Sequence, residues 1–113
     1  MNENLIIKLV ISSDRISKRD LNTFKIGLEI HNTSNGVNYF DISQTELFVN
    51  DIRSFAWDLT VQNGTIINLK ILPKRFETVQ WLMGEALFSE EGKYLLRLEL
   101  KNKTLLQNVI VFE

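Results

Sequence analysis

The sequence predicts an all-β fold in which two antiparallel sheets pack face to face, with about seven to nine strands. Apolar residues alternate with polar ones in several short runs, and turn-forming residues separate these runs about every ten residues. No helix-length stretch shows apolar residues with a period of 3.6. Its 113 residues, 44% of them hydrophobic, are enough for one core, so a single domain over residues 1–113 is expected. A small closed barrel is the alternative.

The first half of the chain is expected to hold three strands. Alternating apolar residues predict strands over residues 5–11 and 24–30, with a solvated loop or a single helical turn over 14–22 between them. The Asn-Gly pair at 35–36 tolerates positive φ at little cost. We therefore expect the chain to reverse there and to continue as a strand over 37–42.

The middle of the chain is expected to form two hairpins. Asn50-Asp51 suits a type I′ turn between two short strands, because both residues accept the left-handed region that this turn requires. Residues 55–61 alternate in a way that predicts another strand. The Asn-Gly pair at 63–64 is then the strongest hairpin signal, and it predicts antiparallel pairing with a strand over 67–71.

The last third of the chain is expected to add three strands. Pro73 has no amide hydrogen and belongs in a connection, which leads to a strand over 78–83. A polar corner over 84–91 precedes a strand over 94–100, in which one face is apolar and the other is charged. The final strand is predicted over 105–112.

The corner before the strand at 94–100 resembles that of a known family. Glu90, Gly92, Tyr94 and Leu96 resemble the acidic-x-Gly-x-Tyr-x-Cys corner of immunoglobulin-like domains, with Leu96 in the place of the cysteine. The resemblance implies a cysteine-free immunoglobulin-like β-sandwich. It also implies a structural corner at Gly92 and Tyr94, in which the tyrosine hydroxyl bonds back to the chain a few residues upstream.

A looser resemblance covers most of the chain. Its layout is similar to that of the bacterial intracellular proteinase inhibitor domain, itself an immunoglobulin-like sandwich, and the resemblance implies inhibition of a proteinase. The usual glycine after the proline is replaced by Lys74, so no inhibitory loop is assigned. The residues that carry this likeness are Ile30 to Ser34, Trp57, Leu72-Pro73, Glu77, Trp81 and Gly92 to Tyr94.

Charge and cysteine content exclude several classes of function. Thirteen basic and fourteen acidic side chains leave a net charge of −1, which does not attract nucleic acid. There is no cysteine for disulfide or thiolate chemistry, and no apolar run is long enough to span a membrane. No signal peptide is visible, which predicts a cytoplasmic protein as the sequence stands, or an exported one if the natural chain begins earlier.

Residues for catalysis or metal binding do not form a recognisable pattern. His31 is the only histidine and is predicted to face solvent beside Glu29, and the carboxylates are scattered along the chain. Three Asn-x-Ser/Thr sequences, at Asn32, Asn63 and Asn102, are interpreted as turn residues. We therefore expect no enzyme activity, no cofactor and no metal.

A surplus of aromatic and apolar side chains is the one feature that favours a function. Residues 5–11 and 105–112 are apolar on both faces, which favours a protein partner or self-association. The expected function is a non-enzymatic protein-binding or assembly module. The alternatives are a proteinase inhibitor and a carbohydrate-binding module that uses surface tryptophans. The candidate partner surface consists of Phe48, Ile52, Phe55, Trp57, Phe76 and Trp81.

Overall fold

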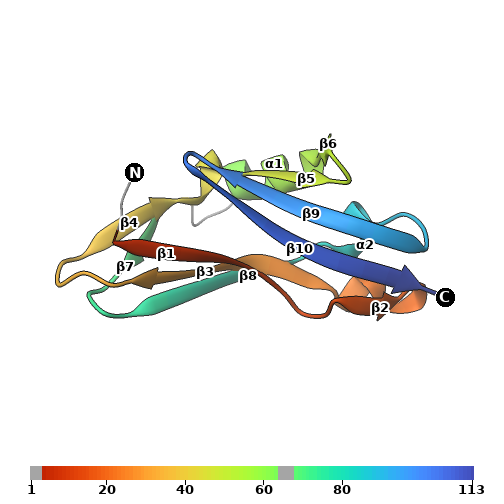
Figure 1. Cartoon of the computed structure of the whole chain (residues 1–113), viewed down its shortest axis with the longest axis horizontal. Helices are drawn as coiled ribbons and strands as arrows, with labels where there is room; N and C mark the ends of the chain where they lie inside the picture. Colours follow the sequence, from red (N-terminus) through yellow and green to blue (C-terminus); the bar gives the residue numbers. More distant parts are fainter. Residues whose placement is uncertain (1–3, 64–67) are drawn as a thin grey trace.

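The computed structural model describes residues 4–63 and 68–113 and consists mainly of β-strands in three sheets (Figure 1). Two α-helices and two 3₁₀ helices connect the strands in this part of the chain. The strands are β1 (Leu5–Ile11), β2 (Arg15–Ser17), β3 (Lys25–Asn32), β4 (Asn38–Asp41), β5 (Glu46–Val49), β6 (Ile52–Arg53), β7 (Asn68–Ile71), β8 (Phe76–Leu82), β9 (Gly92–Leu100) and β10 (Lys103–Phe112). The helices are α1 (Phe55–Asn63), α2 (Gly84–Leu87) and the 3₁₀ segments Lys18–Thr23 and Ile42–Gln44.

The three-stranded sheet has the order β1-β3-β8, and both of its strand pairs are antiparallel. The alternation predicted for the second strand is confirmed, because Ile26, Leu28 and Ile30 of β3 are fully buried. His31 lies on the outer face, and its Nε2 is 2.6 Å from a carboxylate oxygen of Glu29. The sheet therefore has one buried face and one face toward solvent.

The five-stranded sheet has the order β2-β10-β9-β5-β6. Its strand pairs are antiparallel except for β2, which runs parallel to β10. The long β9–β10 hairpin contributes Leu96, Leu98 and Val109 to the core, all fully buried. The two-faced strand predicted at residues 94–100 is confirmed by this burial.

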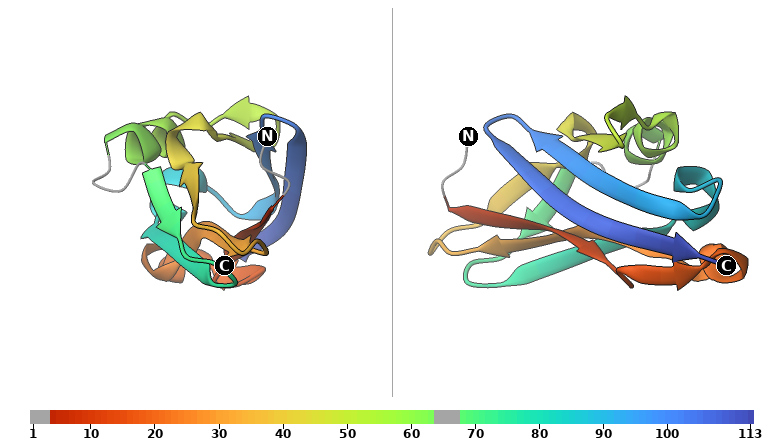
Figure 2. Two further views of the ribbon diagram at one scale, coloured as in Figure 1. Left: turned by 90° about the vertical axis from the view of Figure 1, so that its left-hand side faces the viewer. Right: turned by 45° about the vertical axis from the view of Figure 1, so that its right-hand side comes forward.

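The core lies between these two sheets and is completed by a third, two-stranded sheet of β4 and β7. Viewed along the long axis, the strands surround the interior (Figure 2). Phe24, Trp57 and Phe88 are the largest side chains with almost no exposed surface. Where β1 passes β10, the two strands are not paired as a ladder, but the Gln107 side-chain amide donates a hydrogen bond of 2.9 Å to the Leu9 carbonyl.

The strand predicted over residues 55–61 is wrong, because these residues form helix α1. Apolar residues at every second position also fit a helix that has an apolar pair on each of two faces. Trp57 and Val61 are four residues apart and point into the core, whereas Phe55 and Leu59 are four apart and exposed. The Ser54 hydroxyl accepts a hydrogen bond of 3.2 Å from the Trp57 N–H and caps the helix.

The pairing predicted for residues 67–71 is also wrong, because β7 pairs with β4 and not with residues 55–61. The hairpin turn predicted at Asn63-Gly64 extends outside the described residues. By contrast, Asn50 and Asp51 have φ values of 49° and 68° and close the β5–β6 hairpin, as the type I′ prediction requires. The segment 14–22 contains the short strand β2 as well as a 3₁₀ helix, and α2 lies within the predicted corner at 84–91.

The connection after β3 is organised by a buried side chain and not by positive φ at the Asn-Gly pair. Asn32 is only 2% exposed. Its amide nitrogen donates to the carbonyl groups of Gly36 (2.8 Å) and Ile71 (3.0 Å), and its amide oxygen accepts from the Ser34 N–H (3.0 Å). Asn32 therefore fixes the loop between β3 and β4 and joins it to β7.

The corner before β9 is held by Tyr94. Its hydroxyl donates a hydrogen bond of 2.7 Å to the carbonyl of Glu90, four residues upstream. Gly92 has a φ of 151°, which side-chain-bearing residues rarely adopt. None of the helices in the described residues is long and apolar enough to cross a lipid bilayer.

Candidate partner surface

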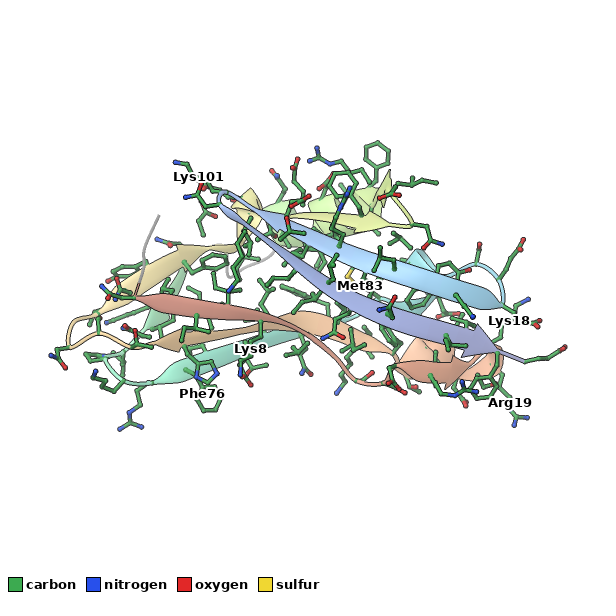
Figure 3. All side chains as sticks on the ribbon, in the orientation of Figure 1. Lys8, Lys18, Arg19, Phe76, Met83 and Lys101 are labelled. Carbon is green, nitrogen blue, oxygen red and sulfur yellow. The ribbon has the colours of Figure 1, made fainter. Side chains whose placement is uncertain are left out.

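The structure does not bring the six predicted surface residues together. Ile52, Phe55 and Phe76 are exposed, Phe48 and Trp81 are half-buried, and Trp57 is fully buried. Figure 3 places Phe76 on the outer side of the three-stranded sheet, whereas Ile52 and Phe55 belong to β6 and α1 on the other side of the molecule (Figure 1). The prediction therefore divides into two separate exposed sites, a pair of packed tryptophans, and Phe48, which is half-buried on β5.

The larger exposed site is formed by Ile52, Phe55 and Leu59, which we call the β6–α1 surface. Their exposed fractions are 72%, 76% and 64%. Phe55 and Leu59 are four residues apart and therefore lie on the same face of the helix. Side chains of this size lose unfavourable contact with water when a partner covers them, so this arrangement is typical of an interaction site.

Sequence reasoning missed Leu59, because a strand would have placed Phe55, Trp57, Leu59 and Val61 together on one face. Two signals could have revealed the helix. Ser54 directly precedes the apolar run, as a helix-capping residue does, and Asp58 lies in the first turn, where a negative charge is favourable.

The β6–α1 surface is held in place by Arg53. Its guanidinium group donates to both carboxylate oxygens of Asp58, at 2.9 Å and 3.3 Å, and lies 2.6 Å from a carboxylate oxygen of Glu46. The hydrogen bond to Asp58, together with the charges of Asp58 and Glu46, raises the pKa of Arg53 above its ordinary value. These contacts of the Arg53 guanidinium join β6 to the first turn of α1, through Asp58, and to β5, through Glu46.

The Asn50-Asp51 turn fixes the other end of β6. The Asn50 N–H donates a hydrogen bond of 2.9 Å to the Leu95 carbonyl. The Leu95 N–H donates one of 2.8 Å to the Asn50 side-chain oxygen. A hollow of about 410 Å³ lies beside Ile52 and Phe55 and reaches Ala86 and Tyr94. Ile52 and Phe55 thus border a depression beside a turn that is hydrogen-bonded to β9.

Phe48 is occupied by a contact within the protein. The guanidinium carbon of Arg97 lies 4.5 Å from the centre of its ring, and the two residues are paired across β5 and β9. Arg97 also lies 3.4 Å from a carboxylate oxygen of Asp51. Phe48 is therefore only partly available to a partner.

Phe76 forms a smaller exposed site with His31. The two rings stack with centroids 5.0 Å apart, and β3 and β8 place them opposite each other. Ile6 pairs with His31 from the other side, so the three side chains form a row across the outer face of the sheet.

The prediction that Trp57 lies on the surface is wrong, because helix α1 directs this side chain into the core, where it is 0% exposed. Its indole N–H donates a hydrogen bond of 3.0 Å to the hydroxyl of buried Thr45. Trp81 packs edge-on against its ring, with the ring centroids 5.4 Å apart. Trp57 is therefore not available as a surface tryptophan for carbohydrate binding, whereas Trp81 packs against it and is only half-buried.

The sequence matches no protein-family model and no curated protein.

Proposed function

We propose that this chain is a non-enzymatic protein-binding module and that it contacts its partner through the β6–α1 surface. The observation that carries the proposal is the exposure of three large apolar side chains, Ile52, Phe55 and Leu59, on two adjacent elements. Large apolar side chains at the centre of an interface contribute most when their conformation is already fixed, because less conformational entropy is lost on binding. The contacts of Arg53 with Asp58 and Glu46, together with the Asn50-Asp51 turn, hold together the backbone segments that carry these side chains.

We further propose that the scaffold is an immunoglobulin-like β-sandwich. In support, β1, β3 and β8 share one sheet, and β5, β9 and β10 share the other, which agrees with the division into A-B-E and C-F-G strands in that family. Tyr94 lies near the start of β9, the strand that corresponds to F, and bonds back to Glu90, as a tyrosine corner does. The departure is Trp57, which lies on a helix after the strand that corresponds to C.

Site-specific photo-cross-linking tests the partner surface. A benzophenone amino acid is introduced at Phe55 of α1, and a matched protein carries it at Phe76, an exposed phenylalanine on strand β8. We expect a defined covalent adduct with a protein from Phe55 and none from Phe76. Equal labelling from both positions, or none from Phe55, would contradict the proposal.

The adduct mass distinguishes the kind of partner. A second copy of the chain doubles the mass, and light scattering should then show a dimer that the Phe55→Ser and Leu59→Ser changes dissociate. Both residues are exposed, so the variants are expected to keep their stability.

A second candidate function is proteinase inhibition, favoured by the exposed turn at Leu72–Arg75. The Arg75 N–H donates a hydrogen bond of 3.2 Å to the Leu72 carbonyl, and the Lys74 ammonium donates one of 2.6 Å to the Thr33 carbonyl. The Lys74 ammonium is therefore engaged within the protein, and Arg75 is the basic side chain that the exposed turn presents to solvent. Titration against a serine proteinase that cleaves after basic residues tests this candidate, and full residual activity at a molar excess of the chain would remove it.

A further inference from the structure

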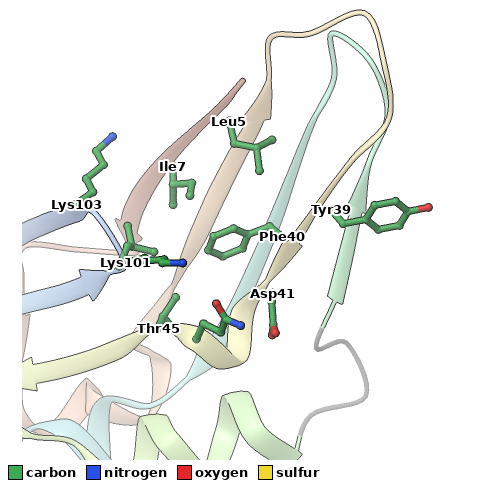
Figure 4. Close-up of a pocket in the computed structure, with 10 residues that line it drawn as sticks. Leu5, Ile7, Tyr39, Phe40, Asp41, Thr45, Lys101 and Lys103 are labelled. Atoms are coloured by element: carbon green, nitrogen blue, oxygen red, sulfur yellow. The ribbon is translucent and has the colours of Figure 1, made fainter. Parts of the chain in front are cut away.

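A cavity of about 300 Å³ opens where the three sheets meet, between β1, β4 and the tip of the β9–β10 hairpin (Figure 4). It shares no lining residue with the β6–α1 surface. Its apolar wall is formed by Leu5 and Ile7 of β1, Phe40 of β4 and Leu100 of β9. These four side chains are only half-buried, so their apolar surface still loses contact with water if a ligand enters.

The mouth of this cavity is positively charged. Lys101 and Lys103 both line it; in Figure 4 the Lys101 side chain extends toward Phe40, whereas the Lys103 side chain extends away from it at the rim. In the described part of the chain, neither lysine forms an ion pair. The whole chain has a net charge of −1, so the positive mouth is a local feature.

Asp41 is the one carboxylate among the lining residues, and it is already bonded within the protein. Its Oδ1 accepts from the Ser43 N–H at 3.0 Å and from the Ser43 hydroxyl at 2.5 Å. The Thr45 hydroxyl is likewise used, since it donates to the Ile42 carbonyl and accepts from Trp57. The two lysines and the Gln44 amide therefore remain as partners for a ligand.

We propose that this cavity binds a medium-chain carboxylate, with its head group at Lys101 and Lys103 and its alkyl chain against Leu5, Ile7 and Phe40. A cationic mouth over an apolar wall complements a molecule that has one negative end and one apolar end. A volume of about 300 Å³ is near the lower limit of ligand cavities, roughly 300–1,000 Å³, which favours a short chain over a long-chain lipid.

Calorimetric titration with decanoate and with decanol, both below their aggregation concentrations, tests the proposal. The two probes share an alkyl chain and differ in head-group charge. We expect saturable binding of one decanoate per chain, with decanol at least about fivefold weaker, because the lysines attract only the anion. The methyl groups of Leu5, Ile7 and Leu100 should shift in the ¹³C NMR spectrum, and those of Leu59 should not.

Two double variants with the same change in net charge provide the matched control. Lys101→Gln with Lys103→Gln should remove the preference for decanoate over decanol. Lys25→Gln with Lys93→Gln, which changes two exposed lysines elsewhere, should preserve it. The proposal is overturned if decanoate and decanol bind equally to the unmodified chain, if decanoate does not bind, or if the shifts appear at Leu59 instead. Because the cavity and the β6–α1 surface are separate, failure here leaves the cross-linking result unaffected.

Discussion

At the scale of single residues, the absence of a side chain at Gly27 sets how closely β3 and β8 approach. A Cβ atom at this position would lie 1.8 Å from the backbone oxygen of Val79, a distance that no van der Waals contact permits. The obstacle is backbone, so it cannot be relieved by a change of rotamer. Gly27 is therefore required by the packing of the central strand, although the alternation pattern alone gives no sign of it.

The Gly27→Ala change should lower the free energy of unfolding by about 3 kcal/mol or more, because β3 and β8 must separate to accept the methyl group. Urea denaturation followed by tryptophan fluorescence measures this loss. Gly36→Ala is the control, since a Cβ at Gly36 meets no atom within 4 Å, and its effect should stay within about 0.5 kcal/mol. Equal stability of the two variants would show that the strands are not packed as described.

At the scale of elements, α1 depends on a cap at its first turn. The Ser54→Ala change removes the acceptor of the Trp57 N–H and should cost about 1 kcal/mol of stability. Thermal and urea unfolding measure the cost, with Ser89→Ala as the control at an exposed serine. If both serine variants unfold like the unmodified chain, the capping role of Ser54 is wrong.

Most strands could be predicted from their apolar pattern, whereas the apolar pattern of α1 predicts a strand, and only Ser54 and Asp58 at its first turn indicate a helix. In β3 and β9 the two faces differ in polarity, so a period of two is unambiguous. In α1 both faces are apolar: Trp57 and Val61 lie in the core, and Phe55 and Leu59 lie outside. No polar face then reveals the helical period, and the same four residues also fit a strand.

The candidate site was only partly predictable for the same reason. Ile52 and Phe55 are exposed, but Trp57 was assigned to the surface and is buried, and Leu59 was not singled out. Pairing of β4 with β7 joins segments that are distant in the sequence, and no local signal specifies such a partner. The lysine-lined cavity depends on three separate sheets and was likewise beyond the reach of local patterns.

At the scale of the whole molecule, the two main sheets meet at β1 and β10 without a shared ladder. The Gln107 side chain joins them by donating to the Leu9 carbonyl. A side-chain hydrogen bond of this kind contributes about 1 kcal/mol, so the remaining stability along this line comes from apolar packing.

The Gln107→Ala change should therefore lower the free energy of unfolding by about 1 kcal/mol. Amide hydrogen exchange should become faster in β1 than in β9, since β1 is an edge strand, whereas β9 has partners on both sides. Gln80→Ala, at an exposed position on β8, is the control and should have little effect. Uniform acceleration of exchange in both strands would contradict a local role for Gln107.

The buried position of Asn32 determines how the folded chain would respond to an oligosaccharide transferase. Asn32-Thr33-Ser34 is an acceptor sequence, but a sugar on this amide nitrogen would take the place of a hydrogen bond to Gly36 or Ile71 at a site with almost no solvent access. The native structure is therefore incompatible with glycosylation at Asn32. Asn102, exposed in the turn between β9 and β10, could carry a glycan without loss of internal contacts.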